Sequence, residues 1–188
     1  GFDFTDEGWY LLTARYPQAI TAILTMFYIY TGLMFKLVNY NIVAFRYFNL
    51  ILELCSLLIF AFGMDRLWAV LHGIKTGFFE KLTYVSFIAM GGLLGFTILG
   101  CTPSYNTLNS QAAYTVLGLF SYALANLLEE KFTYKTKILL FLAGLGLGLS
   151  FMSKFSSAVC LGAIIIGGIA FVPRIKFLNK LSCSLFFL

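Results

Sequence analysis

Long apolar runs separated by short polar connections dominate the pattern along this chain. A helix that crosses a bilayer needs about 20 mostly apolar residues, because each residue rises ~1.5 Å and the hydrocarbon core is ~30 Å thick. Five runs reach or approach that length and predict five spanning helices: residues 42–63, 82–100, 111–128, 138–151 and 156–172. We therefore expect an all-α, polytopic transmembrane protein in which residues 1–188 form a single transmembrane domain.

A sixth apolar run, residues 19–37, allows two interpretations. It contains several tyrosines and Lys36, which prefer the membrane interface, and only residues 38–41 separate it from the next run. If the run crosses the membrane, residues 1–17 lie in the cytoplasm. If it forms an interfacial helix, residues 1–17 form an outward acidic loop. The hydropathy pattern alone leaves both interpretations open.

The two ends of the chain suggest that it continues in both directions. It begins at Gly1 without a methionine, and residues 185–188 open a new apolar run. We expect residues 173–188 to form a cytoplasmic connection and the start of a further helix. On this interpretation the chain is the N-terminal fragment of a longer polytopic protein.

Composition strengthens the membrane assignment. Hydrophobic residues make up 60% of the chain and charged residues only 11%, whereas a soluble domain carries roughly 25% charged residues. A soluble fold of this size has no interior large enough to hide that excess. The net charge of +5 does not indicate nucleic acid, because the basic residues sit between apolar runs and form no stripe. The four cysteines are scattered and predict neither a zinc site nor a disulfide framework.

Basic residues in the connections predict the orientation. Nine lysines and arginines fall in three alternate connections, residues 64–81, 129–137 and 173–181, whereas the intervening connections hold only Lys154. Cytoplasmic loops carry the excess of basic residues in membrane proteins. The three basic connections are therefore expected in the cytoplasm, with Lys154 and residues 101–109 outside. We expect a multi-pass integral protein of the bacterial inner membrane.

The densest acidic cluster lies near the N-terminus. Asp3, Asp6 and Glu7 are three of the eight acidic residues in the chain, and aromatic residues surround them. Adjacent carboxylates at a membrane surface can bind a divalent cation or act as a general base. The same pattern also fits a solvated loop without a chemical role.

Two charged residues fall inside one predicted spanning helix. Arg46 and Glu53 are seven residues apart, which places them on one helix face two turns apart. Charges inside lipid are costly and are candidates for function. The two residues are interpreted either as members of a structural ion pair, interhelical or with each other, or as the polar lining below an outward cavity.

Three further polar residues fall on the predicted outer side. Lys154 lies between two apolar runs, where it can meet a lipid phosphate or simply extend its ammonium to the interface. Tyr105 and Asn106 follow Pro103 just before a predicted helix. Asn106 or Thr107 can cap that helix, or the residues can contact a ligand.

Two glycine pairs predict close helix contacts. Gly91 with Gly95, and Gly144 with Gly148, form GxxxG motifs within apolar runs. Small residues at this spacing allow the backbones of neighbouring helices to approach each other closely in a membrane.

Four segments together resemble one family of membrane enzymes. They are Asp-Glu-Gly-Trp-Tyr-Leu-Leu at 6–12 with Tyr-Pro at 16–17, Phe-Arg-Tyr-Phe-Asn at 45–49, Thr-Pro-Ser-Tyr-Asn-Thr-Leu at 102–108, and Gly-Leu-Gly-Leu-Gly-Leu-Ser-Phe-Met-Ser-Lys at 144–154. In this order they resemble segments of the GT-C glycosyltransferases, and more narrowly of the protein O-mannosyltransferase and aminoarabinose transferase group. That group has an interfacial helix after its acidic loop, which favours the interfacial interpretation of residues 19–37.

The resemblance implies an inverting transfer of a hexose or pentose from a polyprenyl-phosphate donor to an acceptor hydroxyl at the outer membrane face. Asp6 then matches the catalytic general base, and Glu7 helps to position the acceptor or a divalent cation, the one cofactor implied. Lys154 and Arg46 become candidates for the cations that face the lipid phosphate. Tyr105 and Asn106 become candidates for donor contact. The acceptor, whether lipid, glycan or protein, is not specified by the residues.

Two other functions remain open. A transporter or flippase of lipid-linked sugars would line a path with Arg46 and Glu53. A non-catalytic membrane subunit would use its polar residues only to pack helices. An outward acidic loop favours the enzyme, whereas a pair of carboxylates buried at the midplane would favour transport.

Overall fold

The computed structural model describes residues 4–19, 26–99, 102–129, 131 and 133–171. Within these ranges the chain forms seven α-helices and one short 3-10 turn, with no strand. The elements are α1 (Phe4–Arg15), η1 (Pro17–Ala19), α2 (Phe27–Leu37), α3 (Ile42–His72), α4 (Phe78–Leu99), α5 (Tyr105–Leu128), α6 (Tyr134–Ser153) and α7 (Phe155–Ala170). The predicted all-α class is confirmed for the described residues.

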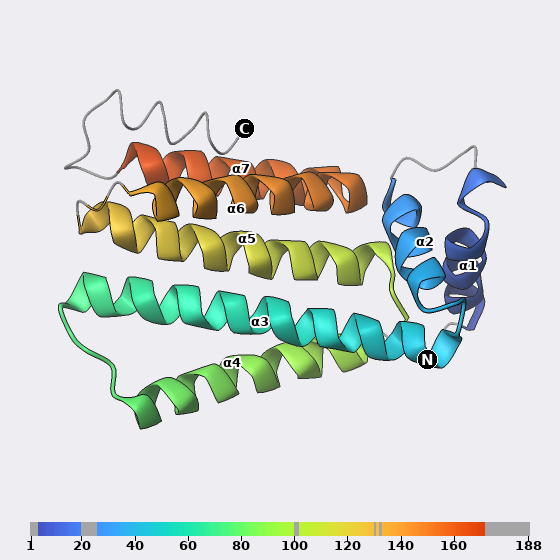
Figure 1. The fold of residues 1–188 in the computed structure, drawn as a ribbon, viewed down its shortest axis with the longest axis horizontal. Coiled ribbons are helices and arrows are strands. Elements are labelled where there is room, and N and C mark those ends of the chain that lie inside the picture. Colours follow the sequence, from blue (N-terminus) through green and yellow to red (C-terminus); the bar gives the residue numbers. More distant parts are fainter. Residues whose placement is uncertain (1–3, 20–25, 100–101, 130, 132, 172–188) are drawn as a thin grey trace.

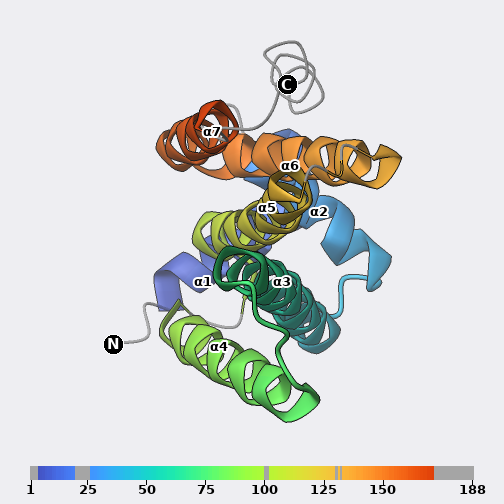
Figure 2. The ribbon, with the colours of Figure 1, turned by 90° about the vertical axis from the view of Figure 1, so that its left-hand side faces the viewer.

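Five of these helices form an elongated bundle, and two lie across one end of it. Helices α3 to α7 run back and forth along the long axis in Figure 1, with α5 between α3 and α6. Figure 2 shows α4 on the far side of α3 and α7 on the far side of the bundle, next to α6. Helices α1 and α2 stand across the end at which α3, α5 and α7 begin.

Each of the five predicted spanning runs lies in one bundle helix, but fewer of these helices meet the requirements for a span. Among the described residues, α3, α5 and α6 are long and apolar enough to cross a membrane, three helices instead of five. Helix α4 has 22 residues, with Glu80 and Lys81 in its first turns. Helix α7 has 16 residues and so measures about 24 Å, less than the ~30 Å of a hydrocarbon core.

The distribution of side chains over the bundle is that of a protein in lipid. Large apolar side chains face outward, for example Phe87, which is 74% exposed, and Phe141, which is 53% exposed. Polar side chains such as Asn49, Gln111 and Ser150 are buried between the helices. Polar groups satisfied between helices and apolar groups on the outside are what a bilayer requires. This distribution and the three long apolar helices indicate a membrane-embedded protein.

The N-terminal segment differs from its prediction. The sequence suggests a loop over residues 1–17, but Phe4–Arg15 form helix α1, which packs against α2. Ala14 of α1 is buried in a cluster with Phe35 and Phe45. This packing offsets the helix-breaking tendency of Gly8, which local sequence patterns cannot reveal.

The predicted interfacial run 19–37 contains a helix too short to span. Helix α2 has 11 residues, so it is about 16 Å long, and it lies across the end of the bundle rather than along it (Figure 1). Residues 20–25 lie outside the described part. The chain then reverses into α3 through Asn39 and Tyr40, whose φ angles of 53° and 58° are left-handed. Arg15 stacks on the Tyr40 ring at 4.1 Å and so joins α1 to this turn.

Glycine brings helices together at Gly146, inside the second predicted motif, where a Cβ would lie 2.8 Å from Val116 Cγ2 of α5, but not at three of the four motif positions. A Cβ atom at Gly91, Gly95 or Gly148 would meet nothing within 4 Å, so these GxxxG positions face open space. The closest approach is instead between α3 and α5, where a Cβ on Gly63 would lie 2.0 Å from the carbonyl oxygen of Gly118. The two helices therefore cross with their backbones in contact.

Candidate functional site

The predicted site residues from the bundle come together at one end of the molecule. Helices α3, α5 and α7 begin there, which places Arg46, Tyr105 and Lys154 near the crossing pair α1 and α2 (Figure 1). The connections 73–77 and 129–133, with their basic residues, lie at the opposite end. Two of the three basic connections predicted on one side thus lie at one end of the described bundle, and the third, residues 173–181, lies outside the described residues.

Glu7, Arg46 and Thr102 form the central contact at this end. Arg46 donates through Nη2 to Glu7 Oε1, in an ion pair that joins α1 to α3. The Thr102 hydroxyl donates to the same carboxylate oxygen, and Arg46 Nε donates to Thr102 Oγ1 at 3.3 Å. Three segments that are distant in the sequence are therefore held in one hydrogen-bonded cluster.

This cluster keeps the Glu7 carboxylate ionised. The hydrogen bond from Thr102 lowers the pKa of Glu7, burial opposes this effect, and Arg46 lowers the pKa further through its hydrogen bond and its charge. The side chains of Arg46 and Glu7 remain 42% and 32% exposed. The pair is therefore charged, positioned and still accessible from outside the bundle.

Asp6, the predicted catalytic base, lies in the first turn of α1, but its side chain lies outside the described part of the structure. Asp3 lies outside it altogether. Among the residues that are described, no group of three or more His, Cys, Asp or Glu side chains could hold a metal ion. The assignment of a divalent cation to Asp6 and Glu7 stays a prediction.

Tyr105 belongs to an aromatic cluster that joins α5 to the crossing helices. Its ring centroid lies 6.3 Å from that of Tyr10 in α1 and 6.0 Å from that of Phe27 in α2. Tyr10 and Phe27 also meet each other edge to face at 5.9 Å. Tyr105 is half-buried in this packing, which holds α1 and α2 against the start of α5.

The cap of α5 separates the roles predicted for Asn106 and Thr107. Ser104 is the N-cap residue, and its side chain accepts from the Thr107 amide at 3.2 Å. The Thr107 hydroxyl accepts from the Ser104 amide at 2.8 Å and completes a capping box. Asn106 takes no part in this cap and is half-buried, so its side chain is left for other contacts.

Lys154 occupies the junction between α6 and α7. It is exposed, and no ion pair to its ammonium is found among the described residues. The amide of Met26 donates to the Met152 carbonyl at 2.9 Å, so this junction lies directly beside the start of α2. Phe27 follows Met26, which connects the junction to the aromatic cluster around Tyr105.

Arg46 forms an interhelical ion pair with Glu7, one of the two forms of ion pair expected for it, and does not pair with Glu53. Glu53 is only 2% exposed, and its Oε2 has no hydrogen-bond partner among the described atoms. Next to it in the core, Gln111 donates to Asn49 Oδ1 at 2.8 Å across α3 and α5. The described core holds one such carboxylate here, not the pair expected for a transport path.

The chain was compared with protein families, curated proteins and solved structures. No family model, curated protein or solved structure matches it. The likeness to GT-C enzymes therefore rests on the ordered motifs alone.

The sequence does not predict a role for one residue of the cluster, Thr102. This residue falls in the segment 102–108 that resembles a family loop, and its hydroxyl bridges Glu7 and Arg46. The one available signal was its position in the single outward connection with several polar residues, 102–107. Nothing in the local sequence indicates which carboxylate it meets.

Proposed function

We propose that this protein is a membrane glycosyltransferase of the GT-C type, which moves a sugar from a polyprenyl-phosphate donor to an acceptor hydroxyl at the outer membrane face. One observation carries the proposal. The Glu7–Arg46–Thr102 cluster joins three of the segments that resemble the family, and it does so at the end of the bundle opposite the basic connections. The proposed transfer needs an acidic residue, a cation and hydroxyl donors close together at the outer end of the bundle.

The proposed placement in the membrane follows from the same division. Helices α3, α5 and α6 cross the bilayer of the bacterial inner membrane, α4 and α7 pack beside them, and the basic connections lie in the cytoplasm. Helices α1 and α2 lie in the outer interface across the end of the bundle. The aromatic cluster of Tyr10, Phe27 and Tyr105 then sits at the headgroup level, where aromatic rings are favoured.

The proposed reaction uses the residues of α1 as acid–base groups. Asp6 takes the proton from the acceptor hydroxyl while the oxygen forms a bond to the anomeric carbon from the face opposite the phosphate. The bond between that carbon and the phosphate oxygen breaks, and its electron pair stays on the lipid phosphate. Glu7, fixed by Arg46 and Thr102, holds α1, the helix that carries Asp6, against the bundle. The charge of the Glu7 carboxylate is already neutralised by Arg46, so the proposed transfer does not use a metal ion at Glu7.

The leaving phosphate needs positive charge close by. Lys154 is exposed at this end, as are Arg15 of α1 and Lys36 of α2, and it has no ion pair within the described ranges. Arg46 shares its charge with Glu7 and so contributes less to the phosphate. A preorganised cation at the site where charge develops lowers the barrier of such a step.

The test measures sugar release from ¹⁴C-labelled polyprenyl-phosphate hexoses and pentoses in membranes that contain the protein and the native acceptors. Asp6→Asn should lower transfer by roughly 10²–10⁴-fold, the usual contribution of a general base. The matched control is Glu80→Gln, which changes a carboxylate at the far end that accepts only from the Gly77 amide at 2.9 Å. Near-normal transfer by Asp6→Asn at normal expression would remove the base assignment.

Transport remains the second candidate, because Glu53 is a buried carboxylate with an unpartnered oxygen inside a spanning helix. The variant Glu53→Gln separates the two functions. A glycosyltransferase with its chemistry at the outer face should keep its transfer rate in this variant, whereas a transporter that relies on the charge of Glu53 should lose flux of the lipid-linked sugar across the membrane.

A further inference from the structure

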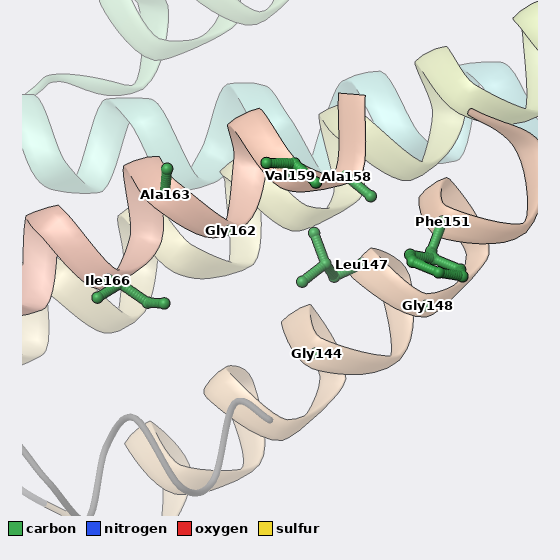
Figure 3. A pocket seen from close by; sticks show the side chains of 9 residues that line it. All are labelled: Gly144, Leu147, Gly148, Phe151, Ala158, Val159, Gly162, Ala163 and Ile166. Carbon is green, nitrogen blue, oxygen red and sulfur yellow. The ribbon is translucent and has the colours of Figure 1, made fainter. Parts of the chain in front are cut away.

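A groove opens between α6 and α7 on the side of the bundle. Its volume is about 500 Å³, within the ~300–1,000 Å³ of pockets that hold small ligands. Every residue that lines it is glycine or apolar, and Figure 3 shows their side chains along the two helices. On helices that are embedded in a membrane, such a groove opens toward lipid chains.

The groove is built into the packing of both helices on α5. Helix α6 lies close to α5 at Gly146, where a Cβ would come within 2.8 Å of Val116 Cγ2. Helix α7 is held at Gly168, where a Cβ would come within 2.6 Å of the Phe120 ring. Each helix is therefore fixed to α5 independently, and the space between their outer faces is not closed by direct contact.

Asn109 of α5 fixes the two helices relative to each other behind the groove. Its Oδ1 accepts from Ser150 of α6 at 2.9 Å, and its Nδ2 donates to Ser157 of α7 at 3.2 Å. The two hydrogen bonds of Asn109 join α6 and α7 through α5. The walls of the groove therefore keep their spacing without a ligand. A preformed groove binds with a smaller entropic cost than one that has to open.

The walls have room because of two of the glycines. A Cβ at Gly148 would meet nothing within 4 Å, and a Cβ at Gly162 would meet only Leu147 at 3.7 Å. The groove is therefore a smooth channel that a flexible hydrocarbon chain can fill. Gly148 belongs to the predicted GxxxG pair, so this motif faces the groove instead of a neighbouring helix of the described bundle.

One end of the groove lies next to a cation. Phe151 and Ala158 line that end, and Lys154 lies between them in the chain at the α6–α7 junction. Lys154 is also the N-cap residue of α7, whose first turn has no side-chain cap. The positive end of the helix dipole and the ammonium group thus share the position at which the apolar groove reaches the membrane surface.

We propose that the groove between α6 and α7 holds the first part of the isoprenoid chain of a polyprenyl phosphate, whose phosphate meets Lys154 and the start of α7. This inference rests on the proposed function, which supplies the choice of a polyprenyl phosphate over other lipid phosphates. The apolar groove matches the chain, and the cation at its outer end matches the anionic head. The phosphate is then held beside α2 and the aromatic cluster, at the same end as Glu7 and Arg46.

The experiment uses the purified protein in phosphatidylcholine nanodiscs and a polyprenyl phosphate with a diazirine in its isoprenoid chain. After irradiation, mass spectrometry should locate the label on peptides from 144–166. Unlabelled polyprenyl phosphate should compete at least tenfold better than phosphatidic acid, which carries acyl chains, and than polyprenol, which lacks the phosphate.

Two matched pairs of variants test the two parts of the site. Gly148→Leu fills the groove and should lower labelling at least tenfold, because it displaces several buried methylene groups. Gly91→Leu makes the same change at another glycine with open space around it, on α4, and should label normally. Lys154→Ala should remove the advantage of polyprenyl phosphate over polyprenol, whereas Lys135→Ala at the opposite end should keep it.

The outcomes separate this inference from the proposed function. Label outside α6 and α7, equal effects of Gly148→Leu and Gly91→Leu, or equal competition by phosphatidic acid would each overturn the groove assignment. The milder Gly148→Ala should give an intermediate loss, which answers the objection that the leucine variant fails to fold. If Asp6→Asn retains full transfer while the label maps to the groove, the enzyme proposal fails and the lipid site stands.

Discussion

Replacing Gly63 by alanine should separate the two helices at the centre of the bundle. In the native protein, a Cβ at this position would lie 2.0 Å from the Gly118 carbonyl oxygen, and ordinary contact begins at 3.4 Å. The difference between these distances means that α3 and α5 must move apart by at least about 1.4 Å. The obstacle is backbone, so no rotation of a side chain can relieve it.

The cost can be derived from two opposing effects. Overpacking a well-packed contact costs typically ~1–3 kcal/mol, and a backbone obstacle belongs at the upper end of that range. Alanine regains up to ~1 kcal/mol over glycine in a helix interior. The net destabilisation is therefore about 2 kcal/mol, which corresponds to a fall in Tm of roughly 4–8 °C for a chain of this length.

The assay is thermal unfolding in detergent micelles, followed by the fluorescence of the two tryptophans, Trp68 on α3 and Trp9 on α1. The control is Gly91→Ala, a glycine on α4 whose added Cβ would meet nothing within 4 Å. Here only the gain in helix propensity acts, so Tm should rise by about 2 °C. Equal shifts in the two variants, or a stabilised Gly63→Ala protein, would refute the close crossing of α3 and α5.

Three further predictions concern the outer end. The pKa of Glu7 is held below its ordinary value of 4.5 by Thr102 and Arg46, so the docking of α1 is stable above that pH and should weaken as pH falls through the lowered pKa; amide hydrogen exchange in α1 should show this dependence, and Glu7→Gln should abolish it. A cysteine at Asn106 should react with a membrane-impermeant maleimide in whole cells, whereas one at Lys135 should react only after permeabilisation; the reverse pattern would invert the proposed orientation. Asn109→Leu should destabilise the contact between α6 and α7 by roughly 1–3 kcal/mol, because Ser150 and Ser157 lose their buried partner; an unchanged Tm would exclude the bridge.

The helices of the bundle could be predicted from the sequence because a spanning segment is recognised from its own residues, as a long apolar run. An apolar run of sufficient length is already a helix in a bilayer, since its backbone has no other way to satisfy its hydrogen bonds. The start of α3 agrees with the predicted run at residue 42, whereas α5 begins at Tyr105 with Ser104 as its N-cap, before the predicted run at 111 and not at the caps predicted for it, Asn106 or Thr107. Helix α1 was missed, since its stability comes from packing Ala14 against α2 and α3 rather than from its own pattern.

The contacts between helices could not be predicted in the same way. The GxxxG motifs marked Gly91, Gly95 and Gly148, all of which face open space, whereas the close crossing uses Gly63 and Gly118, which belong to no short motif. Which glycine faces a neighbour depends on the rotation of each helix, and a one-residue shift turns a helix by about 100°. The Glu7–Arg46–Thr102 cluster could not be predicted either, because its members lie far apart in the sequence and only the fold brings them together.

The fold also separates the two cations that the resemblance made candidates for the lipid phosphate, Lys154 ahead of Arg46. Arg46 stands at the start of α3, where its guanidinium is bound by Glu7 and Thr102, so its charge is used to hold α1 against the bundle. Lys154 stands at the α6–α7 junction without an ion pair in the described part of the chain, so its charge is available to a ligand. A rigid, forked guanidinium suits the structural role, and a flexible ammonium on a long stem suits a mobile lipid phosphate. We therefore propose that the two basic residues at this end have separate roles, Arg46 in positioning the acidic helix and Lys154 in binding the phosphate of a lipid donor.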